Sequence, residues 1–351
     1  MKETTLSIKN IAANNPFQKR RTAFREKIMM IVDDENIEVF EELMQDPILR
    51  EKVIYILTNS LNIRENYNFR SRVYPIGANI RSLLKHDIVD EILCCFSSMS
   101  YDYVKNLAVL CNDFGVSLII QPNDRYLNLS FTQSKFVGDF IFYSILTSPL
   151  KTIDYHLKTS TEITFAAISL VLLSPVLLVV AFLIKVTSRG PVIFKQQRVG
   201  LRGRRFYIYK FRTMVIDAEH LKASLIGLNE TDGPAFKIKN DPRITGIGKI
   251  LRKTGFDEIP QLFNVLRNEM SLIGPRPMLP EEVSAQQEWQ LKRMCIKPGI
   301  TCTWQIHPNR NDVPFEQWMQ LDRDYVENWS IRKDVKIFFS TLRSVFMASG
   351  H

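Results

Sequence analysis

The sequence predicts an α/β protein in three parts: a parallel sheet covered by helices, one membrane helix, and a C-terminal globular domain. Three observations lead to this prediction. Apolar strand-like runs alternate with helical patterns through residues 26–122, which is typical of a parallel sheet with crossover helices. Residues 164–184 contain no charge and are long enough to cross a bilayer. Most polar motifs fall in residues 190–351.

The composition is that of a folded protein with an anionic partner. Of 351 residues, 45% are hydrophobic and 24% are charged, which excludes wholesale disorder and suits about two domains. The formal net charge of +9 indicates nucleic acid, a membrane surface or a phosphorylated substrate, without choosing among them. Five cysteines without a CxxC pair favour a reducing compartment, and the five histidines form no zinc motif.

The N-terminal domain is predicted at residues 26–122, after a tail at 1–25 that has no secretion signal. Buried strands are expected at 27–32, 52–57, 91–96 and 116–120, and helices at 37–45, 79–86 and 101–114. This alternation describes a Rossmann-like sheet. The turn after the first strand reads VDDEN, which is acidic and lacks glycine, so we expect no nucleotide cofactor there.

A connector is predicted at residues 123–158. Its apolar stretch, FVGDFIFYSIL at 136–146, is too short to span a bilayer. It either lies at a membrane interface or packs within the fold.

The membrane helix is predicted at residues 159–189, and its uncharged core would be roughly 32 Å long. Ser174-Pro175 lies in the middle. Pro175 has no N–H for the carbonyl of Val171, so we expect a break there, with the Ser174 hydroxyl satisfying freed backbone groups. An ordinary proline kink in a spanning helix is the alternative.

The flanks of this helix favour a re-entrant path. Nine basic residues and no acidic residue lie between Lys185 and Arg212, which places that side in the cytoplasm. The N-terminal domain, with free cysteines and no export signal, is also expected there. A helix with both ends in the cytoplasm must leave the membrane on the side where it entered.

The first candidate for chemistry is the carboxylate pair Asp257-Glu258. It opens the segment DEIPQLFNVL (257–266), whose apolar residues, Ile259, Leu262, Phe263 and Leu266, recur at helical spacing with Pro260 in the first turn. The helix macrodipole would favour both carboxylates as anions. An ionised carboxylate can act as a nucleophile or a Mg²⁺ ligand, whereas a simple helix cap is the structural alternative.

Basic residues in stiff loops accompany this pair. Arg252 precedes it, Arg276 follows within GPRP (274–277), and Asp241 and Arg243 lie in NDPRIT (240–245). Lys210 and Arg212 follow the strand-like run at 204–209. Arginine binds phosphate through paired hydrogen bonds, so the cluster predicts a phosphate site, with solvated surface arginines as the alternative. The last stretch, 333–348, predicts an amphipathic helix that either lies at a membrane interface or packs on its own domain.

Taken in order, these blocks resemble the bacterial sugar transferases, also called monotopic phosphoglycosyl transferases, over residues 147–347. The blocks are the Ser174-Pro175 segment, GPVIFKQQRVG (190–200), YKFRTM (209–214), FKIKNDPRIT (236–245), DEIPQLFNVL (257–266), MSLIGPRP (270–277), KPGITCTWQ (297–305) and YVENWS (325–330). The resemblance implies a re-entrant membrane helix and a mainly α-helical C-terminal transferase domain at 190–351. Residues 26–122 resemble the Rossmann-like domain of longer members, for which we expect a role in regulation or assembly.

The resemblance also implies an activity. The protein would transfer a sugar 1-phosphate from a UDP-sugar to undecaprenyl phosphate at the cytoplasmic face of the bacterial inner membrane, releasing UMP and initiating polysaccharide synthesis. Asp257 is implied as the nucleophile and as a Mg²⁺ ligand, with Glu258 completing the pair. Phosphate contacts are implied for Lys210, Arg212, Arg252 and Arg276, and weaker nucleotide-sugar contacts for Lys237, Asp241, Arg243 and Arg310.

The alternative function is a non-enzymatic membrane scaffold that recruits polysaccharide-synthesis enzymes, which would not need Asp257-Glu258. Nucleic-acid binding is not expected, because the basic run adjoins a membrane segment and no nucleic-acid-binding motif is present. A dinucleotide-dependent sugar-modifying enzyme is disfavoured by the missing glycine turn. The basic run is expected to contact anionic lipids. The sugar, the pathway and the oligomeric state, including a homodimer, stay open.

Overall fold

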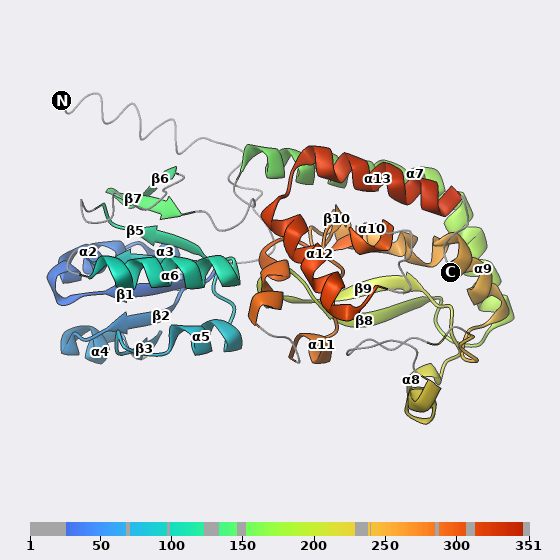
Figure 1. The fold of residues 1–351 in the computed structure, drawn as a ribbon, viewed down its shortest axis with the longest axis horizontal. Coiled ribbons are helices and arrows are strands. Elements are labelled where there is room, and N and C mark those ends of the chain that lie inside the picture. Colours follow the sequence, from blue (N-terminus) through green and yellow to red (C-terminus); the bar gives the residue numbers. More distant parts are fainter. Residues whose placement is uncertain are drawn as a thin grey trace.

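The computed structural model describes residues 26–67, 71–96, 99–122, 133–145, 152–228, 238, 240–284, 288–306 and 313–346. The tail predicted at 1–25 and two of the predicted nucleotide-sugar contacts, Lys237 and Arg310, lie outside these residues. Figure 1 shows an N-terminal unit (26–145) beside a C-terminal unit (152–346).

The N-terminal unit is built on a seven-stranded sheet in the order β3-β2-β1-β4-β5-β7-β6. Its five parallel strands are β1 (Ile28–Val32), β2 (Val53–Thr58), β3 (Arg72–Tyr74), β4 (Glu91–Cys95) and β5 (Ser117–Ile120). The helices are α2 (Ile37–Leu43), α3 (Pro47–Lys52), α4 (Leu61–Tyr67), α5 (Ile80–His86) and α6 (Tyr101–Phe114). The four strands and three helices predicted from the sequence are therefore confirmed.

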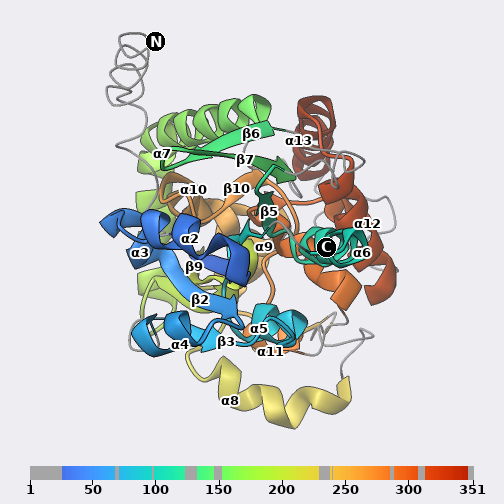
Figure 2. The same cartoon turned by 90° about the vertical axis from the view of Figure 1, so that its left-hand side faces the viewer.

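Alternate residues of β1 explain why this sheet has two covered faces. Met29 and Ile31 pack with α5 and α6 on one face, whereas Met30 and Val32 pack with α2, α3 and α4 on the other. Figure 2 views this unit with the sheet between its two helix layers. Both faces are apolar, so the strands read as continuous apolar runs in the sequence.

The predicted connector contains a hairpin that joins the sheet. Strands β6 (Gln133–Val137) and β7 (Phe140–Ile145) are antiparallel, and β7 pairs with β5. Gly138 adopts φ 60° between them, a conformation that favours glycine. Of the two placements left open for residues 136–146, the structure has packing within the fold for 136–145, the part that it describes.

The membrane segment is the long helix α7 (Ile153–Thr187), which begins within the predicted connector. Among the residues that the structure describes, it is the one helix long and apolar enough to cross a membrane. Pro175 lies inside it, and α7 continues through Pro175 as one helix without the expected break. The Ser174 Oγ donates to the carbonyl of Val171 at 2.7 Å, so the hydroxyl satisfies a freed backbone group as expected. Figure 1 shows α7 running beside α13 and then turning toward α9.

After α7, shorter elements make up the rest of the C-terminal unit. Its helices are α8 (Ala218–Lys222), α9 (Gly246–Thr254), α10 (Leu262–Leu266), α11 (Pro280–Ser284), α12 (Phe315–Glu327) and α13 (Ile331–Phe346). Its strands are the antiparallel pair β8 (Ile193–Val199) and β9 (Arg205–Phe211), and the parallel pair β10 (Ser271–Ile273) and β11 (Gly299–Thr301). The 3₁₀ turns of this unit include η4 (Leu201–Gly203), η6 (Phe256–Gln261) and η7 (Glu288–Cys295). Helices contribute most of the regular structure in this unit.

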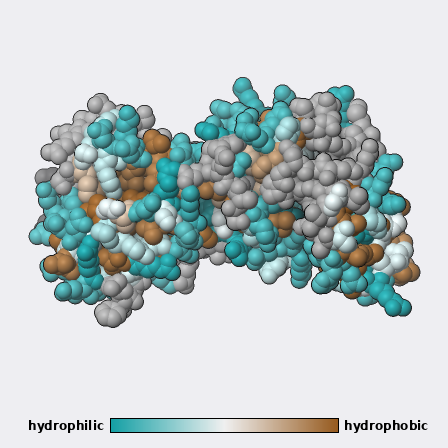
Figure 3. Space-filling model, turned by 60° about the horizontal axis from the view of Figure 1, so that its bottom comes forward, coloured by the Kyte–Doolittle hydropathy of each residue, from teal (hydrophilic) through white to brown (hydrophobic). Residues whose placement is uncertain are grey.

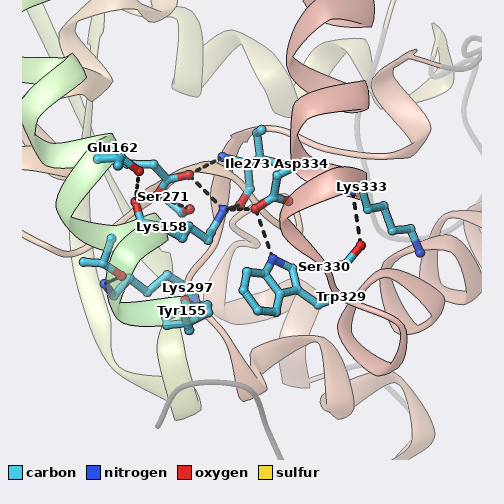
Figure 4. A network of polar contacts seen from close by, with 12 residues as sticks. Tyr155, Lys158, Glu162, Ser271, Ile273, Lys297, Trp329, Ser330, Lys333 and Asp334 are labelled. Carbon is cyan, nitrogen blue, oxygen red and sulfur yellow. Dashed lines mark hydrogen bonds and ion pairs between the residues drawn. The ribbon is translucent and has the colours of Figure 1, made fainter. Parts of the chain in front are cut away.

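A buried ionic network joins the first turns of α7 to the rest of the C-terminal unit (Figure 4). Lys158 of α7 donates to Glu162 at 2.8 Å, to Asp334 of α13 at 2.7 Å and to the carbonyl of Ile273 at 3.0 Å. Asp334 also accepts from Tyr325 and Trp329, and Ser271 donates to Glu162. The network joins α7, β10 and α13, three elements that the chain places far apart.

Helix α13 packs on its own domain, which is one of its two expected placements, and a place at a membrane interface stays a prediction. Ile337 is buried against the domain, whereas Val335, Phe339 and Leu342 are exposed. Their exposed face lies beside α7, whose Phe165 ring meets Phe338 edge-on. Figure 3 brings the lower side of Figure 1 forward, away from α7 and α13, and there the surface is mainly hydrophilic with scattered apolar residues.

The two units meet through polar contacts at one end of the sheet. Asp90 accepts from Arg202 at 2.7 Å and from Arg204 at 2.5 Å, both in or beside η4. Lys292 of η7 donates to the Asn112 side chain at 2.7 Å, at the C-terminal end of α6. A side chain at Gly115 would collide with Cys295, so glycine permits α6 to end against η7.

Candidate active site

The carboxylate pair lies on η6, which packs against β9. Gly255 ends α9 in the left-handed conformation with φ 72°, and the chain then turns into η6 and α10. The fully buried Asn264 fixes this arrangement, because it accepts from the Tyr209 amide at 3.2 Å and donates to the Tyr207 carbonyl at 2.7 Å. The pair is thereby held beside the end of β9, where Lys210 lies.

Lys210 and Glu258 form a direct ion pair, with 2.5 Å between Nζ and Oε1. Burial acts to raise the pKa of Glu258, but Lys210 outweighs it and lowers that pKa. Asp257 is 9% exposed, and burial together with the Glu258 charge raises its pKa to about 6. Glu258 is therefore ionised near neutral pH, and Asp257 is ionised above about pH 6. The raised Asp257 pKa differs from the expectation that the helix macrodipole favours both anions, because burial and the Glu258 charge dominate.

Two arginines add positive charge around the pair. Arg252 on α9 donates from Nε to the Thr213 Oγ1 at 3.0 Å, and its pKa is lowered by burial although Asp257 opposes that shift. Arg276 lies over the Trp304 ring, 5.9 Å from its centroid, and its charge helps to lower the Glu258 pKa. The structure thus brings Lys210, Arg252 and Arg276 into the electrostatic environment of the Asp257-Glu258 pair.

Arg212 lies apart from this group, at the end of α7. Its Nη2 donates to the Ser188 carbonyl at 2.8 Å and to the Ser188 hydroxyl at 2.7 Å. Its Nε and Nη1 are buried without a hydrogen-bond partner. A side chain at Gly190, where φ is 115°, would collide with Nη1, so glycine leaves room for the guanidinium.

Asp241 and Arg243, predicted as weak nucleotide-sugar contacts, bind each other. Arg243 forms a buried two-pronged pair with Asp241, with the Nη2 to Oδ2 distance at 2.6 Å, and also donates to the Ala218 carbonyl at 3.0 Å. The pair fixes the turn that leads to α9. Its two charges act on Arg252 in opposite directions, since Asp241 raises and Arg243 lowers the Arg252 pKa.

One detail of the predicted helix is wrong. Phe263 was placed on its apolar face, but this side chain is 50% exposed, and Asn264 faces the core instead. The reason is the pair of bonds that Asn264 makes to β9. A lone amide within the apolar run LFNVL was the sequence signal for this buried role.

The donors around the pair suit an anionic substrate. Asp257 and Glu258 offer the one or two carboxylates with which Mg²⁺ is usually held beside substrate phosphates. No group of three or more His, Cys, Asp or Glu side chains able to hold a metal ion occurs among the described residues. The residues therefore fit a Mg²⁺ ion that is bound together with a diphosphate.

Comparison with known proteins identifies the family to which this chain belongs. The sequence profile of the family described as bacterial sugar transferase matches residues 153–348, which include α7 and the whole site. The chain belongs to the bacterial sugar transferase family. Exopolysaccharide production protein ExoY of Rhizobium meliloti is 35% identical to this sugar transferase over 208 residues, 58% of this chain and 92% of that protein.

Other relatives extend beyond the matched region. The galactosyl transferase CpsE of Streptococcus agalactiae is 40% identical over 285 residues, 78% of this chain and 63% of CpsE. The undecaprenyl-phosphate galactose phosphotransferase of Salmonella typhimurium is 36% identical over 242 residues, 67% of this chain and 50% of that enzyme. This sugar transferase thus spans about half to two thirds of these longer relatives.

Proposed function

We propose that this sugar transferase moves a sugar 1-phosphate from a UDP-sugar to undecaprenyl phosphate, releases UMP and so begins a polysaccharide. The observation that carries the proposal is the buried Asp257 carboxylate among Lys210, Arg252 and Glu258. Relatives whose names specify galactose or glucose transfer to undecaprenyl phosphate support it.

In the first step, an Asp257 carboxylate oxygen attacks the β-phosphorus of the UDP-sugar. The bond from that phosphorus to the oxygen bridging the two phosphates breaks, and UMP leaves with the bonding electrons. The Asp257 pKa of about 6 keeps this carboxylate ionised at neutral pH, while burial limits its hydration. The product is a sugar phosphate bound to Asp257.

In the second step, a phosphate oxygen of undecaprenyl phosphate attacks the same phosphorus. The bond to Asp257 breaks, which regenerates the carboxylate and yields the lipid-linked diphosphate sugar. Negative charge shifts between oxygens in both steps, so fixed cations should supply most of the stabilisation of each transition state. In this proposal Arg252 and Arg276 supply that positive charge, supported by their electrostatic effects on the carboxylate pair and by the Lys210–Glu258 ion pair.

Mg²⁺ belongs to this proposal as an ion bound with the donor. Asp257 and Glu258 would hold it, and when bound it would neutralise charge on the diphosphate.

The membrane part of the proposal places both units in the cytoplasm, with α7 entering and leaving the inner membrane on that side. Support comes from the basic residues that follow α7 and from Pro175 in the middle of its apolar stretch, where the helix can bend back. The active-site residues on β9 and η6 would then face the membrane surface, where the lipid phosphate lies. Exposed Lys185 and Arg189 are placed to meet anionic headgroups.

The deciding experiment is UMP release by detergent-purified protein with Mg²⁺ and either UDP-galactose or UDP-glucose. Without undecaprenyl phosphate we expect about one UMP per active protein, and with it, continuous turnover. Asp257→Asn should lose both, because the amide is not a nucleophile. Full turnover in Asp257→Asn would overturn the nucleophile, and no UMP from folded protein with either donor would favour a scaffold.

The path of α7 can be tested separately. The five native cysteines, all within the described residues, are buried, so single cysteines at Ser160 and Thr187 would be the exposed thiols. We expect a membrane-impermeant maleimide to label both only in inside-out vesicles, and a cysteine at Leu178 in neither orientation. Labelling of Ser160→Cys and Thr187→Cys from opposite sides would replace the re-entrant path with a spanning helix.

A further inference from the structure

Arg276 lies in the loop Gly274-Pro275-Arg276-Pro277. In each residue of this loop, a backbone N–H or carbonyl forms a hydrogen bond with a partner outside the loop. The Gly274 amide donates to the Thr301 carbonyl at 3.1 Å, and the Pro275 carbonyl accepts from the Gly299 amide at 2.9 Å. Gly274 and Gly299 lie so close that a side chain on either would strike the other backbone. This half of the loop is held by β11.

The second half is held by two arginines, of which Arg293 is buried and Arg198 is largely buried. The Arg276 carbonyl accepts from Arg293 Nη2 at 2.8 Å, and the Pro277 carbonyl accepts from Arg198 Nη1 at 3.1 Å. The next carbonyl, Met278, accepts from the Val199 amide at 2.8 Å. Three successive carbonyls are thus bound by donors from η7 and β8.

Burying two guanidinium groups to hold a backbone loop has an evident cost. Burial and the nearby Arg276 charge lower the pKa of Arg198 to about 10, although the Glu282 carboxylate, 3.8 Å away, opposes the shift. Arg198 Nε is buried without a partner. Arg293 is 4% exposed and depends on buried Asp322 for its countercharge. A shorter, uncharged side chain could donate to each of these carbonyls at a lower desolvation cost. The use of two neighbouring arginines therefore indicates a role beyond packing.

We infer that Arg198 and Arg293 are positioning residues, which fix the Arg276 guanidinium for the phosphate that is transferred. Both bind carbonyls that directly follow the Arg276 side chain along the backbone, and together they restrain rotation of this part of the loop. The Arg198 and Arg276 charges repel each other, and the Arg276 guanidinium lies over the Trp304 ring, 5.9 Å from its centroid. This inference rests on the proposed function, because it requires that Arg276 binds substrate phosphate.

A double-mutant cycle on UMP turnover tests the inference with UDP-galactose or UDP-glucose as donor. Arg198→Lys keeps the charge but loses the paired N–H groups, and we expect kcat/KM to fall about 10-fold or more, since small misplacements of a binding group are costly. In an Arg276→Ala background the same exchange should change kcat/KM less than about 2-fold. Arg205→Lys, at the exposed arginine paired across from Val199, is the matched control.

A second arm uses Arg293→Lys, which retains a cation for Asp322 but loses the fork that reaches the Arg276 carbonyl. Its effect should likewise vanish in the Arg276→Ala background. Equal losses in both backgrounds, or no loss with the native Arg276, would overturn the positioning role. If Arg276→Ala alone leaves kcat/KM unchanged, the phosphate role of Arg276 fails and the inference fails with it, whereas turnover in Asp257→Asn would overturn only the nucleophile.

Discussion

The two units bury different kinds of residue. In the N-terminal sheet, strands β1, β4 and β5 bury Ile, Met, Leu, Val and Cys side chains on both faces, and charged groups such as Asp90 are buried at strand ends. The C-terminal unit buries Lys158, Arg293, Asp322 and Asp334 in its interior. Buried charge is costly unless paired. The comparison shows that the C-terminal unit accepts this cost to fix polar groups, whereas the N-terminal unit is stabilised by apolar packing.

The largest effect is expected where the C-terminal unit depends on one cation. Lys158→Met leaves Glu162 and Asp334 buried without their shared partner, and should lower the free energy of unfolding by about 3–5 kcal/mol. Chemical denaturation in detergent measures it. Lys333→Met, which removes an exposed pair with Asp324, is the control and should cost less than about 1 kcal/mol. Similar losses in both variants would refute the contrast.

The next effect concerns the contact between the units. Asp90→Asn leaves Arg202 and Arg204 without a countercharge, and should cost about 2–4 kcal/mol. We expect the single unfolding transition to split as the units uncouple, whereas Glu26→Gln, in a partly exposed pair with Lys52, should leave it unchanged. Burial acts to raise the Asp90 pKa, but Arg204 and Arg202 outweigh it and lower that pKa. This stabilisation is therefore present above the ordinary value of 3.8 and lost as pH falls through the lowered pKa.

A smaller effect of opposite sign is expected at Asp257. Its pKa is raised from 3.8 to about 6, so its contribution to stability is full below pH 3.8 and is lost as pH rises through about 6. At pH 8, Asp257→Asn should therefore stabilise the fold by roughly 2–3 kcal/mol while abolishing turnover. Thermal unfolding measured at pH 8 and pH 5 checks this, with Asp217→Asn as the exposed control. A variant equally stabilised at both pH values would contradict the assignment.

The same pKa predicts the pH dependence of activity. The kcat/KM for UMP release should fall as pH drops through about 6, because protonated Asp257 cannot attack. A profile that stays flat down to pH 4.5, measured with protein shown to remain folded, would contradict a raised Asp257 pKa.

The smallest effect is expected inside the membrane helix. Ser174→Ala removes the bond to the Val171 carbonyl, and should cost about 1 kcal/mol of stability in detergent. Ser160→Ala, at an exposed position near the base of α7, is the control. A loss of several kcal/mol from Ser174→Ala would mean that the hydroxyl does more than satisfy a carbonyl freed by Pro175.

Sequence reasoning succeeded where local pattern decides structure. The alternation of apolar runs predicted β1, β2, β4 and β5, and the bond from Ser174 to Val171 followed from the chemistry of Pro175 alone. The hairpin β6–β7 escaped because its apolar stretch could equally lie at an interface. Its placement depends on pairing with β5, which local pattern does not encode.

The sequence predicted which residues cluster at the site, but not which contacts those residues make. The clustering of Lys210, Arg252 and Arg276 with the carboxylate pair could be expected, and the structure places them together. The separate position of Arg212 and the closed pair of Asp241 with Arg243 could not. These depend on contacts between distant segments, as does the support that Arg293 gives to a residue 17 positions earlier.

The basic run after α7 has a consequence for how the protein adsorbs to a lipid surface. From the sequence alone, the nine cations between Lys185 and Arg212 predict strong electrostatic adsorption. Five of them, Arg198, Arg202, Arg204, Lys210 and Arg212, are occupied within the fold. The other four, Lys185, Arg189, Lys195 and Arg205, are exposed. At about 1 kcal/mol for each cation near an anionic surface, the electrostatic share is less than half of what the sequence suggests. Adhesion therefore depends mainly on apolar surface, and a high-salt wash should leave the protein on vesicles that detergent readily strips.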